Sequence, residues 1–154
     1  MTRFVIFIAC ILFPTFAGLS RSDVALYHKA VSRYSWLNYH TFVIVAEQSR
    51  VHGLRPELVL AVIDAESDGR THAVSRTGAR GLMQVMAKYW YAGNAQDLHI
   101  PRVGISRGCA ALRWAHDVAG GSLLYTLRNY ERGPRGKGFN VRYIARIENN
   151  LEGL

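Results

Sequence analysis

The chain contains little cysteine. Its 154 residues include two, Cys10 and Cys109, and Cys10 lies in an apolar stretch near the N-terminus that has the form of a removable targeting segment. Without that stretch, Cys109 has no partner for an intramolecular disulfide. We therefore expect the packing of an apolar core, and not covalent cross-links, to hold the fold together.

A metal-binding pattern is also missing. The histidines are spread along the sequence without the close His or Cys pairs that zinc sites use. They are His28, His40, His52, His72, His99 and His116. The sequence therefore predicts no metal site, and we expect no other cofactor.

Long hydrophobic runs are confined to the N-terminus. Residues 4–13 are almost all apolar, Arg3 precedes them, and small residues up to Gly18 follow. This order is typical of a secretory signal peptide, whereas a membrane-spanning helix needs roughly 20 apolar residues. We predict that residues 1–18 are a signal peptide, with a retained N-terminal hydrophobic anchor as the alternative. Residues 19–154 would then be exported to the periplasm or stay associated with the cell envelope.

Acidic residues are outnumbered by basic ones. The chain has 11 Asp and Glu against 19 Lys and Arg, which gives a formal charge of +8. Such an excess favours an anionic partner. Export argues against nucleic acid, and no Lys and Arg run with interleaved aromatic residues marks a nucleic-acid groove. Acidic lipid or an anionic envelope polymer remains, although most of the arginines are expected to be solvated surface.

Helical periodicity dominates the rest of the chain, which is 49% hydrophobic and has no repeat or low-complexity tract. Apolar residues recur at three- and four-residue steps in several segments. These segments are residues 24–51 (with a break at Ser35 or Asn38 as an option), 56–67, 82–90, 105–118, 123–130 and 141–151. Residues 68–81 are rich in Gly, Ser, Thr and Asp and read as a loop. We predict a single, mainly α domain with a long loop near its middle.

One carboxylate stands out at the end of an apolar helical segment. Glu66 follows the stripe that begins after Pro56, so an apolar environment and the negative end of the helix would both raise its pKa. A carboxyl group of this kind can donate a proton near neutral pH. The alternative is a solvated group at a helix end. Asp64 and Asp68 lie two residues away on either side, a spacing that points them away from the face of Glu66.

The residues around Glu66 carry a motif. "AESDGRTHAVSRTGARGLMQVM", residues 65–86, contains a Glu-Ser pair, then Ala-x-Ser, then Gly-Ala-x-Gly-Leu-Met-Gln. This order closely resembles the lytic transglycosylases of the soluble lytic murein transglycosylase and goose-type lysozyme-like family. Tyr130 in "LRNYERGP" and Tyr143 in "NVRYIARI" match later positions of that family. The resemblance covers roughly residues 54–147, and it implies a lysozyme-like domain whose long loop borders a saccharide-binding cleft.

The resemblance implies a reaction with a single catalytic carboxylate. Glu66 would protonate the glycosidic oxygen between N-acetylmuramic acid (MurNAc) and N-acetylglucosamine (GlcNAc) in peptidoglycan. As a base, it would then deprotonate the C6 hydroxyl of the same MurNAc, which closes on C1 and leaves an anhydro-MurNAc end. No water, metal or cofactor takes part. Hydrolysis by two carboxylates would need a second acid near the bond.

The remaining site residues follow from the composition of the loop and, for Ser67 and Tyr130, from the same resemblance. Gly78 and Gly81 would support the loop by allowing tight turns close to the sugar. Four residues would bind the substrate. They are Ser67, Met83, Gln84 and Tyr130, with Ser67 orienting the saccharide, Gln84 reaching the cleft from the following helix, and Tyr130 hydrogen-bonding near Glu66. Met83, together with Leu82, would also anchor the loop in the core, with plain packing as its alternative, and a structural role is the alternative for Gln84.

The chain departs from the family pattern at three places. Glu131 stands where an Asn usually follows the motif tyrosine, and it is a surface change, a polar contact to substrate, or a second acid that could hold a water. Gly104 replaces an Asn and would loosen one side of the cleft. Arg135 and Lys137 lie in "GPRGKG", either as a solvated loop or as a rim that attracts peptidoglycan carboxylates.

The function expected from the resemblance is that of an exported peptidoglycan lytic transglycosylase. The alternatives are a lysozyme-like muramidase that hydrolyses the same bond and a catalytically silent murein-binding scaffold. The expected partner is the peptidoglycan glycan strand, and a small enzyme of this kind would serve an envelope-spanning secretion, conjugation or phage machine. We expect a monomer that does not bind nucleic acid.

Overall fold

The computed structural model describes residues 18–133 and 136–154. The predicted signal peptide lies outside this part except for Gly18, and so does Arg135. Within it the fold is mainly α, as predicted. The elements are α1 (Arg21–Arg33), α2 (Tyr39–Val51), α3 (Pro56–Ser67), α4 (Ala87–Trp90), the 3₁₀ helix η2 (Ala95–His99), α5 (Pro101–Val118), α6 (Leu123–Arg132) and α7 (Val141–Glu152). None of the described helices is long and apolar enough to cross a membrane.

Helix α3 lies at the centre of the molecule and carries Glu66 in its last turn. Pro56 occupies the first turn, where its missing N–H is not needed, and Glu57 complements the positive helix start. The residues from Leu58 to Ile63 are all buried. The helix ends where Asp68 adopts a left-handed conformation with φ 50°. The predicted helix over residues 56–67 is therefore confirmed.

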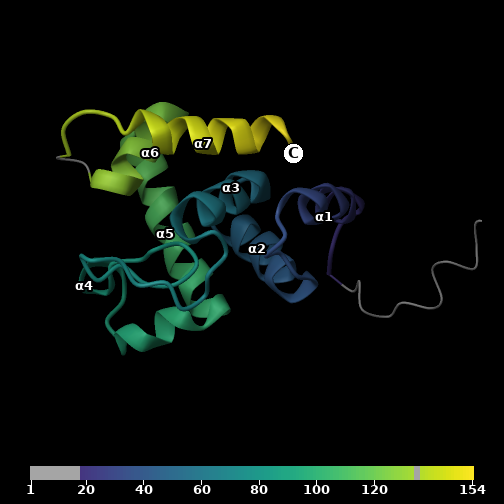
Figure 1. Ribbon diagram of the computed structural model, residues 1–154, viewed down its shortest axis with the longest axis horizontal. Helices are drawn as coiled ribbons and strands as arrows, with labels where there is room; N and C mark the ends of the chain where they lie inside the picture. The colour runs from purple at the N-terminus through teal and green to yellow at the C-terminus, as the bar shows by residue number, and fades with distance from the viewer. Residues whose placement is uncertain (1–17, 134–135) are drawn as a thin grey trace, which may run out of the picture.

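The core lies between α3 and the helices that pack around it, with α2 and α5 on one side and α7 lying across α3 and α6 (Figure 1). Its largest fully buried side chains come from α2, α3, the loop, η2, α5, α6 and α7. They include Phe42, Ile44, Leu60, Ile63, Met83, Leu98, Ile105, Leu112, Leu127 and Ile147. Cys109 is a buried free thiol in this core, and burial raises its pKa to about 12. Burial of these apolar groups provides the main stabilisation of the fold.

The long loop is more extensive than predicted. The sequence pattern predicted a helix over residues 82–90, but only Ala87–Trp90 is helical. Residues 81–84 form turns because Arg80 pairs with Val85 in an antiparallel bridge, and Gln84 has φ 49°. A second bridge joins Val74 to Arg80. Apolar residues that look helical in sequence are therefore the inward-facing side chains of a compact loop.

The other helix predictions differ from the structure mainly at their ends. The segment 24–51 is two helices, and the second begins after Asn38, whose side chain accepts a hydrogen bond from the Thr41 N–H. Helix α5 begins at Pro101, four residues before the predicted start, since Pro suits a first turn.

Candidate active site

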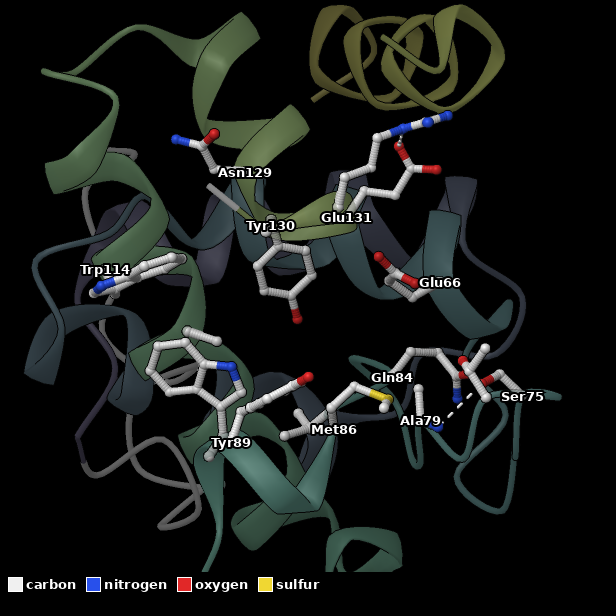
Figure 2. A pocket seen from close by; sticks show the side chains of 16 residues that line it. Glu66, Ser75, Ala79, Gln84, Met86, Tyr89, Trp114, Asn129, Tyr130 and Glu131 are labelled. Carbon is white, nitrogen blue, oxygen red and sulfur yellow. Dashed lines mark hydrogen bonds and ion pairs between the residues drawn. The ribbon is translucent and has the colours of Figure 1, made fainter. Parts of the chain in front are cut away.

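Glu66 opens into a pocket between α3, the loop, α5 and α6. The pocket has a volume of about 670 Å³, a size suited to a small-molecule or sugar ligand. Figure 2 shows Glu66 and Tyr130 pointing inward from α3 and α6, opposite Gln84 and Met86 of the loop side. Trp114 of α5 lies at the other end from Glu66.

The carboxyl group of Glu66 is partly buried and has an altered acidity. Burial raises the pKa of Glu66 to about 7; the hydrogen bond from Tyr143 opposes the rise, and the negative charge of Glu131 adds to it. Desolvation dominates because an apolar wall disfavours the charged form. A substantial fraction of Glu66 is therefore protonated near neutral pH, as a general acid requires.

Tyr143 is the hydrogen-bond partner of Glu66. Its hydroxyl donates to Glu66 Oε1 at 2.8 Å, and burial together with the charge of Glu66 raises the pKa of Tyr143 well above its usual value of 10. The tyrosine therefore stays a donor across the physiological range. The sequence identified Tyr143 as a match to the family but did not assign it this contact, which requires α7 to lie against α3.

Tyr130 hydrogen-bonds to the loop and not to the Glu66 carboxyl group. Its side chain lines the pocket beside Glu66, but its hydroxyl donates to the backbone carbonyl of Met83 at 2.7 Å. The hydrogen bond ties α6 to the loop. The carboxyl group of Glu66 itself accepts a hydrogen bond from Tyr143, because the first turn of α7 directs that residue toward the end of α3.

Two of the predicted substrate-binding side chains lie behind the pocket wall. Ser67 is 1% exposed, and its hydroxyl donates to the Leu82 carbonyl at 2.8 Å. Met83 is fully buried and packs so closely against Gly108 that a Cβ there would overlap its side chain. Ser67 thus has a supporting position in place of the predicted saccharide contact, because its hydroxyl already has a partner inside the core. The burial of Met83 agrees with the alternative of plain packing, in which it anchors the loop in the core.

Gln84 lines the pocket, but from a turn and not from a helix. Its Nε2 group donates to the carbonyls of Ala73 and Gly81, at 3.2 and 3.0 Å. These two bonds hold the side chain against the loop. The amide of Gln84 therefore both closes the turn and forms part of the pocket surface.

The loop glycines have the backbone conformations that the prediction required. Gly78 has φ 89° and Gly81 has φ 75°, a region that side-chain-bearing residues rarely adopt. A Cβ on Gly81 would also collide with the Leu98 carbonyl. Gly81 thus permits a close backbone approach between the loop and η2.

Glu131 lies at the rim of the same pocket. Its Oε1 accepts a hydrogen bond from Asn140 Nδ2 at 2.7 Å, and its Oε2 accepts one from Arg132 Nε at 3.2 Å. The side chain is thus held in place, and its charge reaches Glu66. The position of Glu131 at the pocket therefore argues against the interpretation of this residue as a mere surface change.

Gly104 does not loosen the site as the sequence suggested. It is buried in α5, and a Cβ at this position would collide with the Leu98 carbonyl. The glycine allows α5 to approach η2 closely, so this side of the molecule is tightly packed.

The sequence interpretation missed an aromatic end of the pocket. Tyr89, Trp90 and Trp114 line it, and the rings of Trp90 and Trp114 meet edge to face with centroids 5.5 Å apart. Aromatic faces of this kind can pack against the apolar faces of sugar rings. No local pattern connects the two tryptophans, because α5 brings Trp114 back to α4 only in the folded chain.

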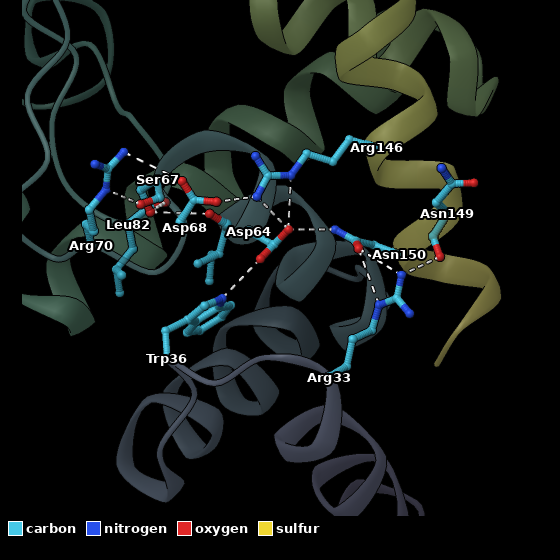
Figure 3. Close-up of polar contacts among 11 residues, drawn as sticks. Arg33, Trp36, Asp64, Ser67, Asp68, Arg70, Leu82, Arg146, Asn149 and Asn150 are labelled. Carbon is cyan, nitrogen blue, oxygen red and sulfur yellow. Dashed lines mark hydrogen bonds and ion pairs between the residues drawn. The ribbon is translucent and has the colours of Figure 1, made fainter.

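A polar network on the other side of α3 fixes the position of α7 (Figure 3). Asp64 accepts hydrogen bonds from Trp36 Nε1 at 3.2 Å, Arg146 Nη2 at 2.9 Å and Asn150 Nδ2 at 2.9 Å. Burial alone would raise the pKa of Asp64, but these hydrogen bonds and the charge of Arg146 outweigh it and hold the pKa below its usual range. Arg146 also pairs with Asp68. The contacts face away from the pocket, as the spacing around Glu66 predicted.

None of the described His, Cys, Asp and Glu residues form a group that could hold a metal ion. The pocket places Glu66 and its tyrosine donor, an arrangement suited to proton transfer, beside a loop, an aromatic end and a second carboxylate.

Comparisons with known proteins agree with the fold and the motif. A structure of an inactive Glu-to-Gln mutant of the lytic transglycosylase Slt from Pseudomonas aeruginosa matches 70% of this chain with a TM-score of 0.55 and 22% identity. The chain spans only 21% of the length of that protein. No curated protein matches the chain in sequence. Residues 43–150 match the Transglycosylase SLT domain, a region that contains both Glu66 and Tyr143, and the chain therefore belongs to that family.

Proposed function

We propose that this protein is a peptidoglycan lytic transglycosylase that cleaves the MurNAc–GlcNAc bond without water. The observation that carries the proposal is Glu66, a partly buried carboxyl with a pKa of about 7 that opens into the pocket and accepts a hydrogen bond from Tyr143. Membership of the Transglycosylase SLT domain family supports the reaction class.

In the first step, protonated Glu66 donates its proton to the glycosidic oxygen. The bond between that oxygen and C1 of MurNAc breaks, and its electron pair stays on the departing oxygen, which becomes a hydroxyl of GlcNAc. Positive charge develops at C1 while Glu66 becomes a carboxylate. The hydroxyl of Tyr143 stabilises the negative charge by donating to Oε1.

In the second step, the Glu66 carboxylate removes the proton from the C6 hydroxyl of the same MurNAc. The C6 oxygen forms a bond to C1, which gives the anhydro sugar and restores protonated Glu66. One carboxyl group is sufficient because the nucleophile belongs to the substrate. A pKa near 7 suits both steps, since the group must give and accept a proton at the same pH.

Hydrolysis by a lysozyme-like mechanism is the second candidate, because Glu131 is a second carboxylate at the same pocket. Both of its oxygens already accept hydrogen bonds, from Asn140 and Arg132. These contacts disfavour its use as the base for a water molecule. A silent murein-binding scaffold is disfavoured by Glu66 itself, since a binding protein gains nothing from a carboxyl group held in an apolar wall.

Product analysis distinguishes the candidates. Purified sacculi are digested with the protein, and the released fragments are examined by mass spectrometry. We expect fragments that end in anhydro-MurNAc. Fragments with reducing MurNAc ends would instead establish hydrolysis, and binding to sacculi without release would establish the scaffold.

The setting proposed for this activity is the cell envelope. The apolar segment at residues 4–13 supports export, and the charge of +8 suits work on an anionic polymer. Glycan strands of peptidoglycan are the proposed partner of a monomeric enzyme, and local opening of the wall for a secretion, conjugation or phage machine is the proposed role.

A further inference from the structure

Three hydrogen bonds connect Glu131 to Glu66 through the start of α7. Glu131 Oε1 accepts from Asn140 Nδ2 at 2.7 Å. Asn140 Oδ1 accepts from the backbone N–H of Tyr143 at 3.2 Å. The hydroxyl of Tyr143 donates to Glu66 Oε1 at 2.8 Å. The chain of contacts runs from the end of α6, through the first turn of α7, to the last turn of α3.

The middle of this chain is the N-cap of α7. Asn140 caps the helix, with its side-chain oxygen on the N–H of the third helical residue, and such a cap fixes where the helix begins and how it enters. The cap follows a segment that contains Gly133, Gly136 and Gly138, residues that restrict the backbone little. A contact of Asn140 outside α7 therefore adds an anchor for this first turn, beyond the network at Asp64.

Glu131 provides that anchor. A hydrogen bond to a carboxylate is stronger than one between neutral groups. Glu131 is the last residue but one of α6, and α6 is itself tied to the loop by Tyr130. An aspartate or asparagine at this place would be one methylene shorter.

We propose that Glu131 is a positioning residue for the reaction of Glu66, acting through Asn140 on Tyr143. The inference rests on the proposed function, and it deepens it by giving a role to a residue at which this chain differs from the usual family pattern. Tyr143 is on the third position of α7, so a shift of the cap moves its hydroxyl directly.

The charge of Glu131 has a second, separable effect. The groups that act on Glu66 are the Tyr143 hydroxyl from α7 and the Glu131 carboxylate from α6, with the Tyr130 ring beside them and Arg132 next to Glu131. A nearby negative charge favours the protonated form of a carboxyl group. Glu131 therefore supports the proton-donating form of Glu66 in addition to holding the cap.

Three variants separate the two effects. Glu131→Gln keeps an oxygen that can accept from Asn140 and removes the charge. Glu131→Ala removes both. Asn140→Ser keeps a capping side chain for α7 and replaces the Nδ2 group that donates to Glu131 by a shorter hydroxyl. Glu148→Gln, on the exposed face of α7, is the matched control for the loss of a carboxylate.

Two measurements are made on each full-length variant. The first is kcat and KM on soluble peptidoglycan fragments as a function of pH, and the second is the titration of the Glu66 carboxyl by ¹³C NMR. We expect kcat of Glu131→Ala and Asn140→Ser to fall about ten- to a hundredfold with little change in KM, and Glu131→Gln to retain more kcat than Glu131→Ala. The Glu66 pKa and the basic limb of the rate profile should move to lower pH in Glu131→Gln, which loses the charge and keeps an acceptor for Asn140. They should move to higher pH in Asn140→Ser, which keeps the charge and loosens the Tyr143 hydrogen bond, and stay in place in Glu148→Gln.

The inference is overturned if Glu131→Ala and Asn140→Ser, folded as judged by their melting temperatures, keep the kcat of the wild type, or if the Glu66 titration moves no further in Glu131→Gln and Asn140→Ser than in Glu148→Gln. The NMR titration does not depend on turnover. If the wild-type protein releases no anhydro product, the proposed function fails, while the link from Glu131 to Glu66 is still tested.

Discussion

The acidity of Glu66 depends on its surroundings more than on its own chemistry. A carboxyl group with an ordinary pKa of 4.5 reaches about 7 here because α3 and the loop remove water from around it. The hydrogen bond from Tyr143 lowers the pKa of Glu66, since it stabilises the charged form. The balance between these two effects places the pKa where one group can serve as acid and then as base.

Replacement of Glu66 by Gln should remove turnover and leave the fold intact. The amide can still accept the Tyr143 hydrogen bond, but it cannot donate a proton, so we expect activity to fall about 10²–10⁴-fold. The melting temperature above pH 7 should not fall, because the variant avoids an ionised carboxylate in an apolar wall. Release of anhydro-muropeptides and thermal unfolding are the measurements. Substantial residual release would show that another group is the acid.

The wild-type protein should lose activity as pH rises through about 7, because the first step needs protonated Glu66. In Tyr143→Phe the hydrogen bond that favours the charged form is absent, so the Glu66 pKa rises and this limb moves to higher pH. The same variant should lose about ten- to a hundredfold in kcat, as the loss of a hydrogen bond to a charged group predicts. A limb that moves to lower pH, or not at all, would contradict the assigned contact.

At the scale of the elements, the docking of α7 on α3 completes the site. Asp64 on α3 binds Arg146 and Asn150 of α7 on the face opposite the pocket, while Tyr143 of the same helix reaches Glu66. Arg33 of α1 contacts the Asn150 side chain and the Asn149 carbonyl at the end of α7. The network (Figure 3) therefore holds the later turns of α7 against α3 and α1, and the Asn140 cap fixes where α7 begins.

Replacement of Asp64 by Asn should destabilise the protein by about 1–3 kcal/mol, because Arg146 and Trp36 lose a charged acceptor in a partly buried site. The pKa of Asp64 lies below its usual range, so its contribution is present above the unfolded pKa and is lost as pH falls through the folded one. The stability difference between wild type and variant should thus shrink in acid. Urea unfolding at neutral and acidic pH measures it, and Glu148→Gln is the control. Equal stabilities at neutral pH would contradict this role.

At the scale of the whole molecule, the site is assembled from distant parts of the chain. The pocket takes its lining from α3, the loop, α4, α5 and α6, and α7 supplies Tyr143. The chain as a whole carries an excess of positive charge, with a formal value of +8. A long-range attraction to an anionic polymer is expected from such a balance, and it weakens as salt screens the charges.

Binding of the protein to purified sacculi should therefore decrease with ionic strength. The inactive Glu66→Gln variant is suited to the measurement, since it does not consume the polymer. We expect co-sedimentation with sacculi to fall clearly between about 50 and about 300 mM salt, where the screening length shortens to below roughly 10 Å. Binding that is independent of salt would indicate that contacts inside the pocket, and not the overall charge, provide the affinity.

Local sequence patterns predicted the structure correctly wherever the feature depends on a single segment of the chain. The apolar stripe after Pro56 predicted α3 and the environment of Glu66, and the glycines at 78 and 81 predicted the turns of the loop. The motif of residues 65–86 also gave the family. Patterns failed at Leu82, Met83 and Gln84, where inward-facing residues of a compact loop have the spacing of a helix. Periodicity records which side chains are buried, and different backbones can bury the same ones.

The sequence by itself determined the mainly α class, the candidate acid and the loop beside it, because these depend on residues close together along the chain. The tertiary structure alone decided which tyrosine holds that acid, that Ser67 and Met83 lie in the wall, and that Glu131 reaches the pocket. The physical reason is that hydrogen bonds and desolvation act over a few ångströms in space, and only the packing of α6 and α7 against α3 brings these groups within that range.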